Sequence, residues 1–317
     1  MNAVVMRVAA VEFFNSLLNH VGNKDKYMQM IEDYIARAAD DGVDLLVFPG
    51  FTGCFYQLME LNGRDFKQAV AMVCHRQFIH SVLDISRKYA LLICPGSYWE
   101  RQGEDVFHAS CLVKSGQVLL EQRQLYLAKW ERELGLSRGI DVELIEINGW
   151  KIGIMLATDV FYPQVARKLA LMGARLVVSP VGFVGDRNAY LQLSGVWQKA
   201  QLNHFFAVES AFNGRLGTKG LLQENSTLSW AGGDEEYNVA SGCKMLWGES
   251  IIHAPLPMTP QENGILKRTS GKIDFITADL DRQGRRQALK EFNALAQLNP
   301  GFYTKIRRLG GQKAADN

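Results

Sequence analysis

Apolar and polar residues recur with two different periods along this chain. Met6 to Val11 has the pattern of a strand, and Asn23 then precedes a stretch whose apolar positions are spaced as in a helix: Tyr27, Ile31, Tyr34, Ile35 and Ala38. Gly42 follows as a helix-ending glycine. The continuous apolar run VDLLVFP, Val43 to Pro49, is typical of a strand covered on both faces. This order predicts a buried sheet with helices outside it.

The same strand and helix signals return further along the chain. An amphipathic stretch from about Arg64 to Ala90 precedes LLICPGS, and a helical stretch from Val165 to Ala174 precedes RLVVSP. Two hairpins lie between them, with their turns at Ser115-Gly116 and Asn148-Gly149. Because helix-linked strands are interleaved with hairpins, we expect a mixed sheet or a pair of sheets with helices outside.

The chain shows no linker, so one domain over residues 1–309 is expected, followed by a flexible tail at 310–317. The stretch from about Gly214 to Trp247 is long and poor in apolar periodicity. It predicts an elaborated surface loop or hairpin arm.

Composition limits the classes of partner that the protein is expected to bind and the compartment in which it is expected to lie. The 317 residues include 35 Lys+Arg and 33 Asp+Glu, a net charge of +2, and 47% are hydrophobic. This balance disfavours nucleic acid or an anionic membrane as the main partner. No apolar run approaches the ~18 residues of a spanning helix, and the first residues lack the features of a signal peptide, which predicts a cytoplasmic protein.

Cysteine and histidine spacing indicates neither a disulfide framework nor a zinc site. The cysteines are odd in number, far apart and without C-x-x-C spacing: Cys54, Cys74, Cys94, Cys111 and Cys243. No metal or organic cofactor is therefore expected. The six histidines show no metal-ligand spacing and are interpreted as structural or exposed. Cys54, just past Pro49, is the one cysteine with the predicted loop position of a reactive group.

Self-contained catalytic motifs are absent: there is no H-E-x-x-H, P-loop or G-x-S-x-G. GRLGTKG, Gly214 to Gly220, lacks the spacing of a nucleotide loop and is interpreted as a surface turn. The informative segments are those that follow predicted strands, where α/β proteins place functional groups. They are VDLLVFP-GFTGCFY, QRQLYLAKWERELGLSRG and WKIGIMLATDVFYPQVARKLALMGARLVVSP.

In this order and at this spacing, the three blocks resemble the signature blocks of the nitrilase superfamily, the carbon-nitrogen hydrolases that include amidases, carbamoylases and nitrilases. The resemblance extends from Met6 to about Leu289 and includes GESIIHAP (Gly248 to Pro255) and GKIDFITADLD (Gly271 to Asp281). It implies an α/β fold, a four-layer α-β-β-α sandwich of two mixed sheets.

The resemblance also implies a degenerate catalytic triad. Gly50 stands where the family has its glutamate base, Gln124 where it has its lysine, and Ala157 where it has its cysteine nucleophile. The immediate neighbours supply no displaced glutamate, lysine or cysteine. In the family's mechanism a thiolate attacks the nitrile or amide carbon, a carboxylate moves protons and a lysine stabilises the anion, so each step needs a side chain that is missing here.

We therefore expect a non-catalytic homologue that binds a small polar ligand or a protein partner. The residues expected around the inherited pocket are Cys54, Glu131, which resembles the family's auxiliary glutamate, Thr158 and Asp159. One alternative is a carbon-nitrogen hydrolase with relocated chemistry, for example through Cys54, and another is a purely structural subunit. Lys129 is a poor substitute for the lost lysine, because five residues displace a strand side chain by up to ~16 Å.

The resemblance further implies self-association. Family members pair through helices that match Phe161 to Ala174 and about Leu191 to Asn203, so a homodimer or larger assembly is expected. A catalytically complete paralogue is another possible partner of such a non-catalytic homologue.

Overall fold

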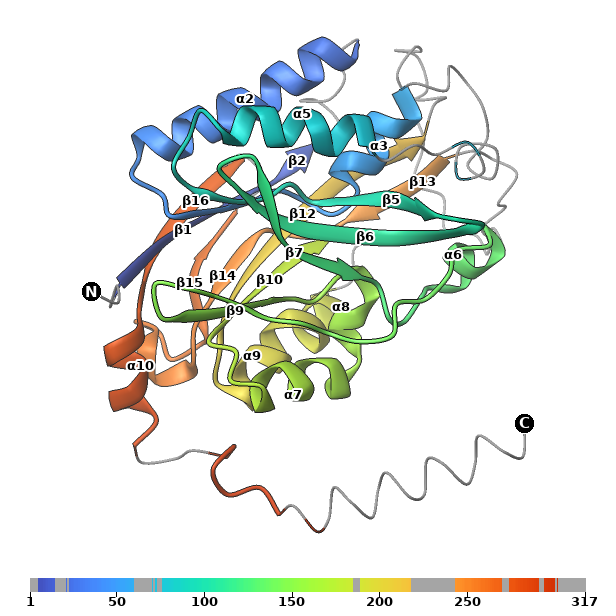
Figure 1. Ribbon diagram of the computed structural model, residues 1–317. Coiled ribbons are helices and arrows are strands. Elements are labelled where there is room, and N and C mark those ends of the chain that lie inside the picture. The colour runs from blue at the N-terminus through green and yellow to red at the C-terminus, as the bar shows by residue number, and fades with distance from the viewer. Residues whose placement is uncertain are drawn as a thin grey trace, which may run out of the picture.

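The computed structural model describes residues 5–14, 21, 23–59, 70, 72, 76–184, 189–217, 243–269, 274–290, 294–299 and 301. These residues form two mixed β-sheets that face each other, with helices on both outer sides (Figure 1). No helix in these ranges is long and apolar enough to cross a membrane.

The first sheet has seven described strands in the order β16-β1-β3-β4-β6-β5, with β7 paired to β6. β1 runs parallel to β3 and antiparallel to β16, so the sheet joins the beginning of the chain to its end. The strands are β1 (Val5–Val11), β3 (Leu45–Val47), β4 (Leu92–Cys94), β5 (Ser97–Gln102), β6 (Asp105–Lys114), β7 (Gln117–Arg123) and β16 (Phe275–Asp281).

The second sheet has nine described strands, six of them in the order β11-β13-β12-β10-β9-β8, with β14 and β2 paired to β12 and β15 paired to β14. β9, β10 and β12 are mutually parallel. The strands are β2 (Phe13–Phe14), β8 (Ile145–Ile147), β9 (Trp150–Ile154), β10 (Leu176–Val181), β11 (Phe183–Val184), β12 (Phe206–Gly217), β13 (Cys243–Trp247), β14 (Ile251–His253) and β15 (Ile265–Arg268).

Helices complete the outer layers. The first sheet is covered by α2 (Lys24–Asp40), α3 (Thr52–Met59) and α5 (Arg76–Ser86), and the second by α7 (Pro163–Leu171), α8 (Ala189–Gln192), a short π-helical stretch η2 (Leu193–Trp197) and α9 (Gln198–Asn203) (Figure 1). The remaining turns of helix are α6 (Lys129–Glu133), the 3₁₀ segments η1 (Ala157–Phe161) and η5 (Leu256–Met258), and α10 (Arg282–Ala288).

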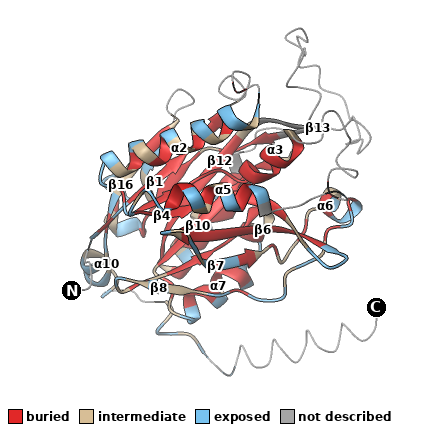
Figure 2. Ribbon diagram, turned by 45° about the horizontal axis from the view of Figure 1, so that its top comes forward, coloured by how far each residue is buried: buried red, intermediate tan, exposed pale blue. Residues whose placement is uncertain are grey.

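Three buried apolar clusters account for the layering. One lies between the two sheets and includes Val8, Leu45, Ile154, Val178 and Val208. The other two fill the space between each sheet and its helices. The central strands are therefore buried on both faces, as Figure 2 shows. The predicted four-layer α-β-β-α sandwich is confirmed.

Local signals in the sequence set several element boundaries. Asn23 caps α2 by accepting a hydrogen bond from the Lys26 amide, and the five apolar residues predicted for its inner face are all buried. Both predicted hairpins form, β6–β7 and β8–β9. Asn148 (φ 51°) and Gly149 (φ 79°) adopt the left-handed conformations that such two-residue turns require.

The predicted arm at 214–247 is described only at its base, where β12 pairs antiparallel with β13 from Gly214–Leu246 to Gly217–Cys243. Residues 218–242 and the predicted tail at 310–317 lie outside the described residues.

Candidate functional site

The family's three catalytic positions lie after strands that end at one edge of the two sheets. Gly50 follows β3, Ala157 follows β9, and Gln124 follows β7. The Gly50 amide donates to the carbonyl oxygen of Val181, at the end of β10, over 3.1 Å. This hydrogen bond joins the end of a strand of the first sheet to the end of a strand of the second.

Gly50 lies too close to Val181 for a side chain to fit. An ideal Cβ built on Gly50 would lie 2.7 Å from the carbonyl carbon of Val181 and 2.8 Å from its oxygen. Gly50 does not have a positive φ; the left-handed residue is the next one, Phe51, at φ 65°. Backbone crowding is the constraint at Gly50.

Ala157 begins η1 in a left-handed conformation. Its φ is 48° and its side chain is buried. An L-residue in this region costs roughly 1–2 kcal/mol relative to the right-handed conformation. The turn thus holds a strained backbone around a methyl group, which has neither a proton to exchange nor a lone pair.

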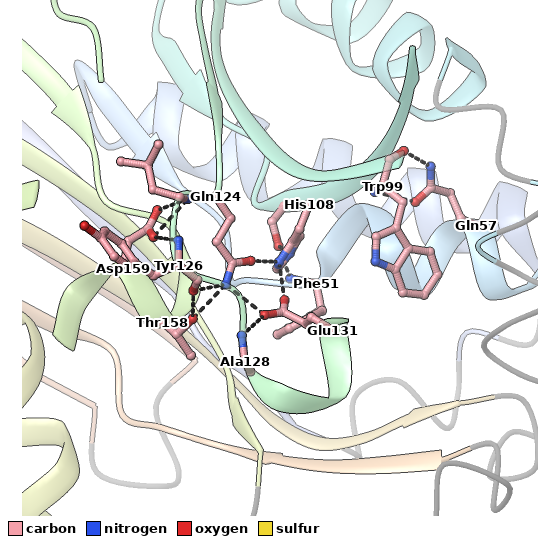
Figure 3. Close-up of polar contacts among 12 residues, drawn as sticks. Phe51, Gln57, Trp99, His108, Gln124, Tyr126, Ala128, Glu131, Thr158 and Asp159 are labelled. Atoms are coloured by element: carbon pink, nitrogen blue, oxygen red, sulfur yellow. Dashed lines mark hydrogen bonds and ion pairs between the residues drawn. The ribbon is translucent and has the colours of Figure 1, made fainter. Parts of the chain in front are cut away.

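Gln124 lies at the centre of a hydrogen-bonded network (Figure 3). Its Nε2 donates to Glu131 Oε2 at 2.8 Å and to Thr158 Oγ1 at 2.7 Å. The Thr158 hydroxyl in turn donates to the carbonyl oxygen of Tyr126. Three of the predicted positions, Gln124, Glu131 and Thr158, are therefore brought together.

His108 is the member of this network that the sequence did not single out. Its Nδ1 lies 2.6 Å from Gln124 Oε1 and 2.9 Å from Glu131 Oε1, two acceptors, so Nδ1 must carry a proton. Its Nε2 lies 2.7 Å from Ser97 Oγ, which accepts the Phe51 amide at 2.6 Å. When the Ser97 hydroxyl donates to Nε2, all these groups are satisfied by a neutral imidazole.

The only sequence signal for His108 was weak: His108 and Ser110 are the polar residues within the buried part of β6. The imidazole also stacks on the Phe51 ring, with centroids 4.8 Å apart and planes 28° apart. Phe51 thereby covers one face of the network.

Glu131 is a buried side chain whose carboxyl oxygens have three donors. Besides His108 and Gln124, the Ala128 amide donates to Glu131 Oε2 over 2.7 Å, which ties the carboxylate to the start of α6. These three donors are an imidazole, a carboxamide and a backbone amide.

Asp159 has a different task from the other predicted pocket residues. Its carboxylate accepts from the amides of Leu125 at 3.0 Å and Tyr126 at 2.8 Å, and so fixes the chain just after Gln124. Burial raises the pKa of Asp159 to about 7, although the two amide donors act in the opposite direction. It positions the backbone next to the network.

Cys54 does not lie in a loop as predicted. It lies inside α3, which begins at Thr52 immediately after the left-handed Phe51, and its side chain is fully buried. Burial, with a further contribution from the negative charge of Glu131, raises the pKa of the Cys54 thiol well above its usual range. A thiolate is strongly disfavoured at this position.

A two-sheet sandwich with its candidate site at the strand ends defines the class of this protein, and comparison with known proteins gives the family. A sequence model of the carbon-nitrogen hydrolases matches residues 7–288. The chain therefore belongs to the carbon-nitrogen hydrolase family, as its resemblance to the nitrilase superfamily predicted.

Individual relatives are distant. The chain is 25% identical over 287 residues to a probable hydrolase, YhcX, of Bacillus subtilis; the match covers 88% of this chain and only half of that protein. Among solved structures, a carbon-nitrogen hydrolase from Helicobacter pylori G27 superposes with a TM-score of 0.73 at 14% identity, covering 96% of this chain and 99% of the other.

An amidase from Nesterenkonia sp. AN1, solved as a cysteine-to-alanine variant, gives a TM-score of 0.70 at 17% identity and covers 96% of this chain and 98% of the other. Another variant of that amidase carries the acetamide moiety of fluoroacetamide, covalently added at its active-site cysteine. At these identities, the structures establish the shared fold.

Proposed function

We propose that this chain is a non-hydrolytic member of the carbon-nitrogen hydrolase family and that it acts by binding. The observation that carries the proposal is Ala157, whose methyl group occupies the turn where the resemblance places the cysteine nucleophile. Without a nucleophile no thioester forms, and losses of this kind cost on the order of 10⁶ in rate where such groups have been dissected.

The electrostatics of the network support the proposal. The resemblance implies that a glutamate and a lysine have been lost together, one negative and one positive charge, so the net charge of the site is unchanged. The remaining acidic side chain, Glu131, bonds to His108, Gln124 and the Ala128 amide. A buried carboxylate with its hydrogen bonds satisfied needs no lysine to be tolerated.

The alternative of relocated chemistry through Cys54 is weakened by its surroundings. A reactive cysteine needs a depressed pKa and access to substrate, whereas Cys54 is fully buried and its pKa is raised.

The polar groups of the network are hydrogen-bonded to one another, and this favours a protein partner over a small polar ligand. Gln124, Glu131 and Asp159 are each 1% exposed or less, and their polar atoms already bond to the protein. Apolar side chains, by contrast, are exposed on the outer helices, Leu171 on α7 (59%) and Leu202 on α9 (51%). We infer that binding takes place through this surface.

Fluoroacetamide and a panel of simple amides, nitriles and N-carbamoyl compounds test the proposal. The unmodified protein should hydrolyse none of them, and intact-mass measurement should show no adduct. Ala157→Cys, with and without Gly50→Glu and Gln124→Lys, tests whether the turn still presents a nucleophile. An adduct on the introduced thiol of the triple variant, with slow hydrolysis, is expected.

Recovery in the triple variant should be partial, because the Gly50→Glu side chain displaces the Val181 backbone and misplacement by ~1 Å can cost about 10²-fold in rate. Cys54→Ala in the unmodified background is the control. Robust hydrolysis by the unmodified protein that disappears in Cys54→Ala would overturn the proposal and establish the relocated nucleophile.

A further inference from the structure

A cluster of arginines lies at the opposite end of the second sheet from the candidate site. Arg282 of α10 donates to the carbonyl of Gly149, just before β9, and Arg285 donates to the carbonyl of His204, just before β12. Arg175 immediately precedes β10: its amide donates to Lys151 and its carbonyl accepts from Phe206. α10 thus covers the amino-terminal ends of three parallel strands (Figure 1).

These cations repel one another. Burial and the charges of Arg286 and Arg282 lower the pKa of Arg175, and burial together with Arg175 and Arg286 lowers the pKa of Arg285 to about 10. The negative charge of Glu146 raises the pKa of Arg175, but it acts more weakly than burial and the two arginines. The nearby carboxylate of Asp281 accepts the Gln283 amide as the cap of α10. The chain as a whole carries only +2, so this concentration of positive charge is local.

One face of α10 borders a hollow of about 310 Å³. Arg282 and Arg286, one turn apart on α10, line it together with Lys290, which lies two residues past the end of the helix, and with Gln283 and Gln287. The described lining therefore contains three cations and two carboxamides and no acidic side chain. Like charges four residues apart on a helix destabilise it unless a counter-charge is present.

We propose that this hollow binds a small phosphate-class anion, such as a phosphomonoester or a pyrophosphate. Arginine guanidinium groups bind phosphate oxygens through two parallel hydrogen bonds, and the glutamine amides supply further donors. The size of the hollow favours a small anion, because a specific nucleic-acid interface buries on the order of 1,000 Å² or more of protein surface.

The anion site is separate from the network around Gln124. Gly149, which Arg282 contacts, precedes β9, and Ala157 follows the same strand. The five residues of β9 alone span about 16 Å. The inference therefore stands independently of whether the chain hydrolyses anything.

Calorimetric titration of the full chain with inorganic pyrophosphate, and with inorganic phosphate, tests the proposal against sodium chloride at matched ionic strength. One pyrophosphate should bind, and the melting temperature should rise with its concentration beyond the effect of chloride. Arg286→Gln and Lys290→Gln should each weaken binding roughly tenfold, and Arg286→Lys should weaken it less because the charge remains.

Arg286 and Lys290 are both exposed, so the three variants should fold. Lys88→Gln, which removes one cation that follows α5 and pairs with Glu32, is the control and should bind pyrophosphate normally. No binding beyond chloride, or equal binding by Arg286→Gln, would overturn the proposal. Binding confined to phosphatidylserine vesicles or to an oligonucleotide, and lost in Arg286→Gln, would also overturn it in favour of a macromolecular phosphate surface.

Discussion

The backbone of Val181 fills the space in which a side chain on Gly50 would begin. Gly50→Ala should therefore lower the free energy of unfolding by about 2–3 kcal/mol through overpacking. Gly103→Ala is the matched control: Gly103 has φ +60° and no atom within 4 Å of an added Cβ, so only conformational strain of about 1 kcal/mol is expected. Urea unfolding measures both. Equal losses would show that crowding against Val181 is not the constraint at position 50.

Asp159 gives the protein a specific pH dependence. Its folded pKa is raised to about 7, so between pH 4 and 7 the folded state holds a proton that the unfolded chain has released. This contribution to stability is full below about pH 4 and is lost as the pH rises through 7. Asp159→Asn cannot ionise and keeps an oxygen for the Leu125 and Tyr126 amides.

The free energy of unfolding of Asp159→Asn should therefore rise relative to that of the unmodified protein between pH 4 and 8, on the order of 3 kcal/mol. Urea titrations of both proteins across this range measure the difference. A difference that does not change with pH would mean that Asp159 ionises normally in the fold.

For single residues, the sequence predicted which ones belong to the candidate site better than it predicted what contacts them. Gln124, Glu131 and Thr158 could be named because each follows a recognisable strand block, and the structure brings them together. His108 could not, since its contacts come from segments 16 and 23 residues away. The crowding at Gly50 depends on Val181 in the other sheet, which no local pattern reveals.

At the scale of elements, the five-residue helix α6 depends on one side chain. Glu131 accepts from Ala128 at the start of α6, and also from Gln124 and His108. Glu131→Ala leaves the Ala128 amide without this partner and removes one of the acceptors of Gln124 and of His108, so we expect a loss of about 2 kcal/mol in unfolding free energy. Glu133→Ala, on the same helix, is the control.

Glu133 is exposed and 3.8 Å from Lys129, so removing its carboxylate should change stability by less than about 0.5 kcal/mol. Denaturant midpoints of the two variants, with unchanged m-values, provide the comparison. A small effect of Glu131→Ala would indicate that water replaces the carboxylate and that the network does not hold α6.

Elements with strong local signals were predictable, and those set by tertiary contacts were not. α2 has a capping residue and a clear apolar face, whereas α3 is eight residues long and contains a glycine at its second position. What fixes α3 is reciprocal hydrogen bonding between the Gln57 side chain and the backbone of Trp99 on β5 (Figure 3). For this reason, Cys54 was wrongly assigned to a loop.

At the scale of the whole molecule, the sequence predicted the order of the layers but not which distant strands pair within each sheet. Continuous apolar runs predicted strands buried on both faces, and Figure 2 shows them in the centre. The pairing of β1 with β16 joins residues about 270 positions apart, from Val5–Asp281 to Val11–Phe275. The resemblance to a known family included the segment that forms β16, but nothing in the sequence indicated that it pairs with β1.

The outer helices of the second sheet carry apolar side chains that the monomer leaves uncovered. On α7 and just after it, Val165 and Leu169 are buried, whereas Leu171 is 59% and Met172 38% exposed. α9 contributes Leu202, which is 51% exposed. These exposed side chains form the surface through which we propose that two copies of the chain pair.

Light scattering coupled to size exclusion should therefore give a mass of at least twice 35.5 kDa for the unmodified protein at micromolar concentration. The double variant Leu171→Glu/Leu202→Glu should be a folded monomer, because a two-fold interface presents each introduced charge twice in a desolvated patch. Ile140→Glu is the control: Ile140 is 99% exposed, outside these helices, and its substitution should leave the mass unchanged. A monomeric unmodified protein would remove the homodimer, and the exposed face of α7 and α9 would then have to be covered by a different chain.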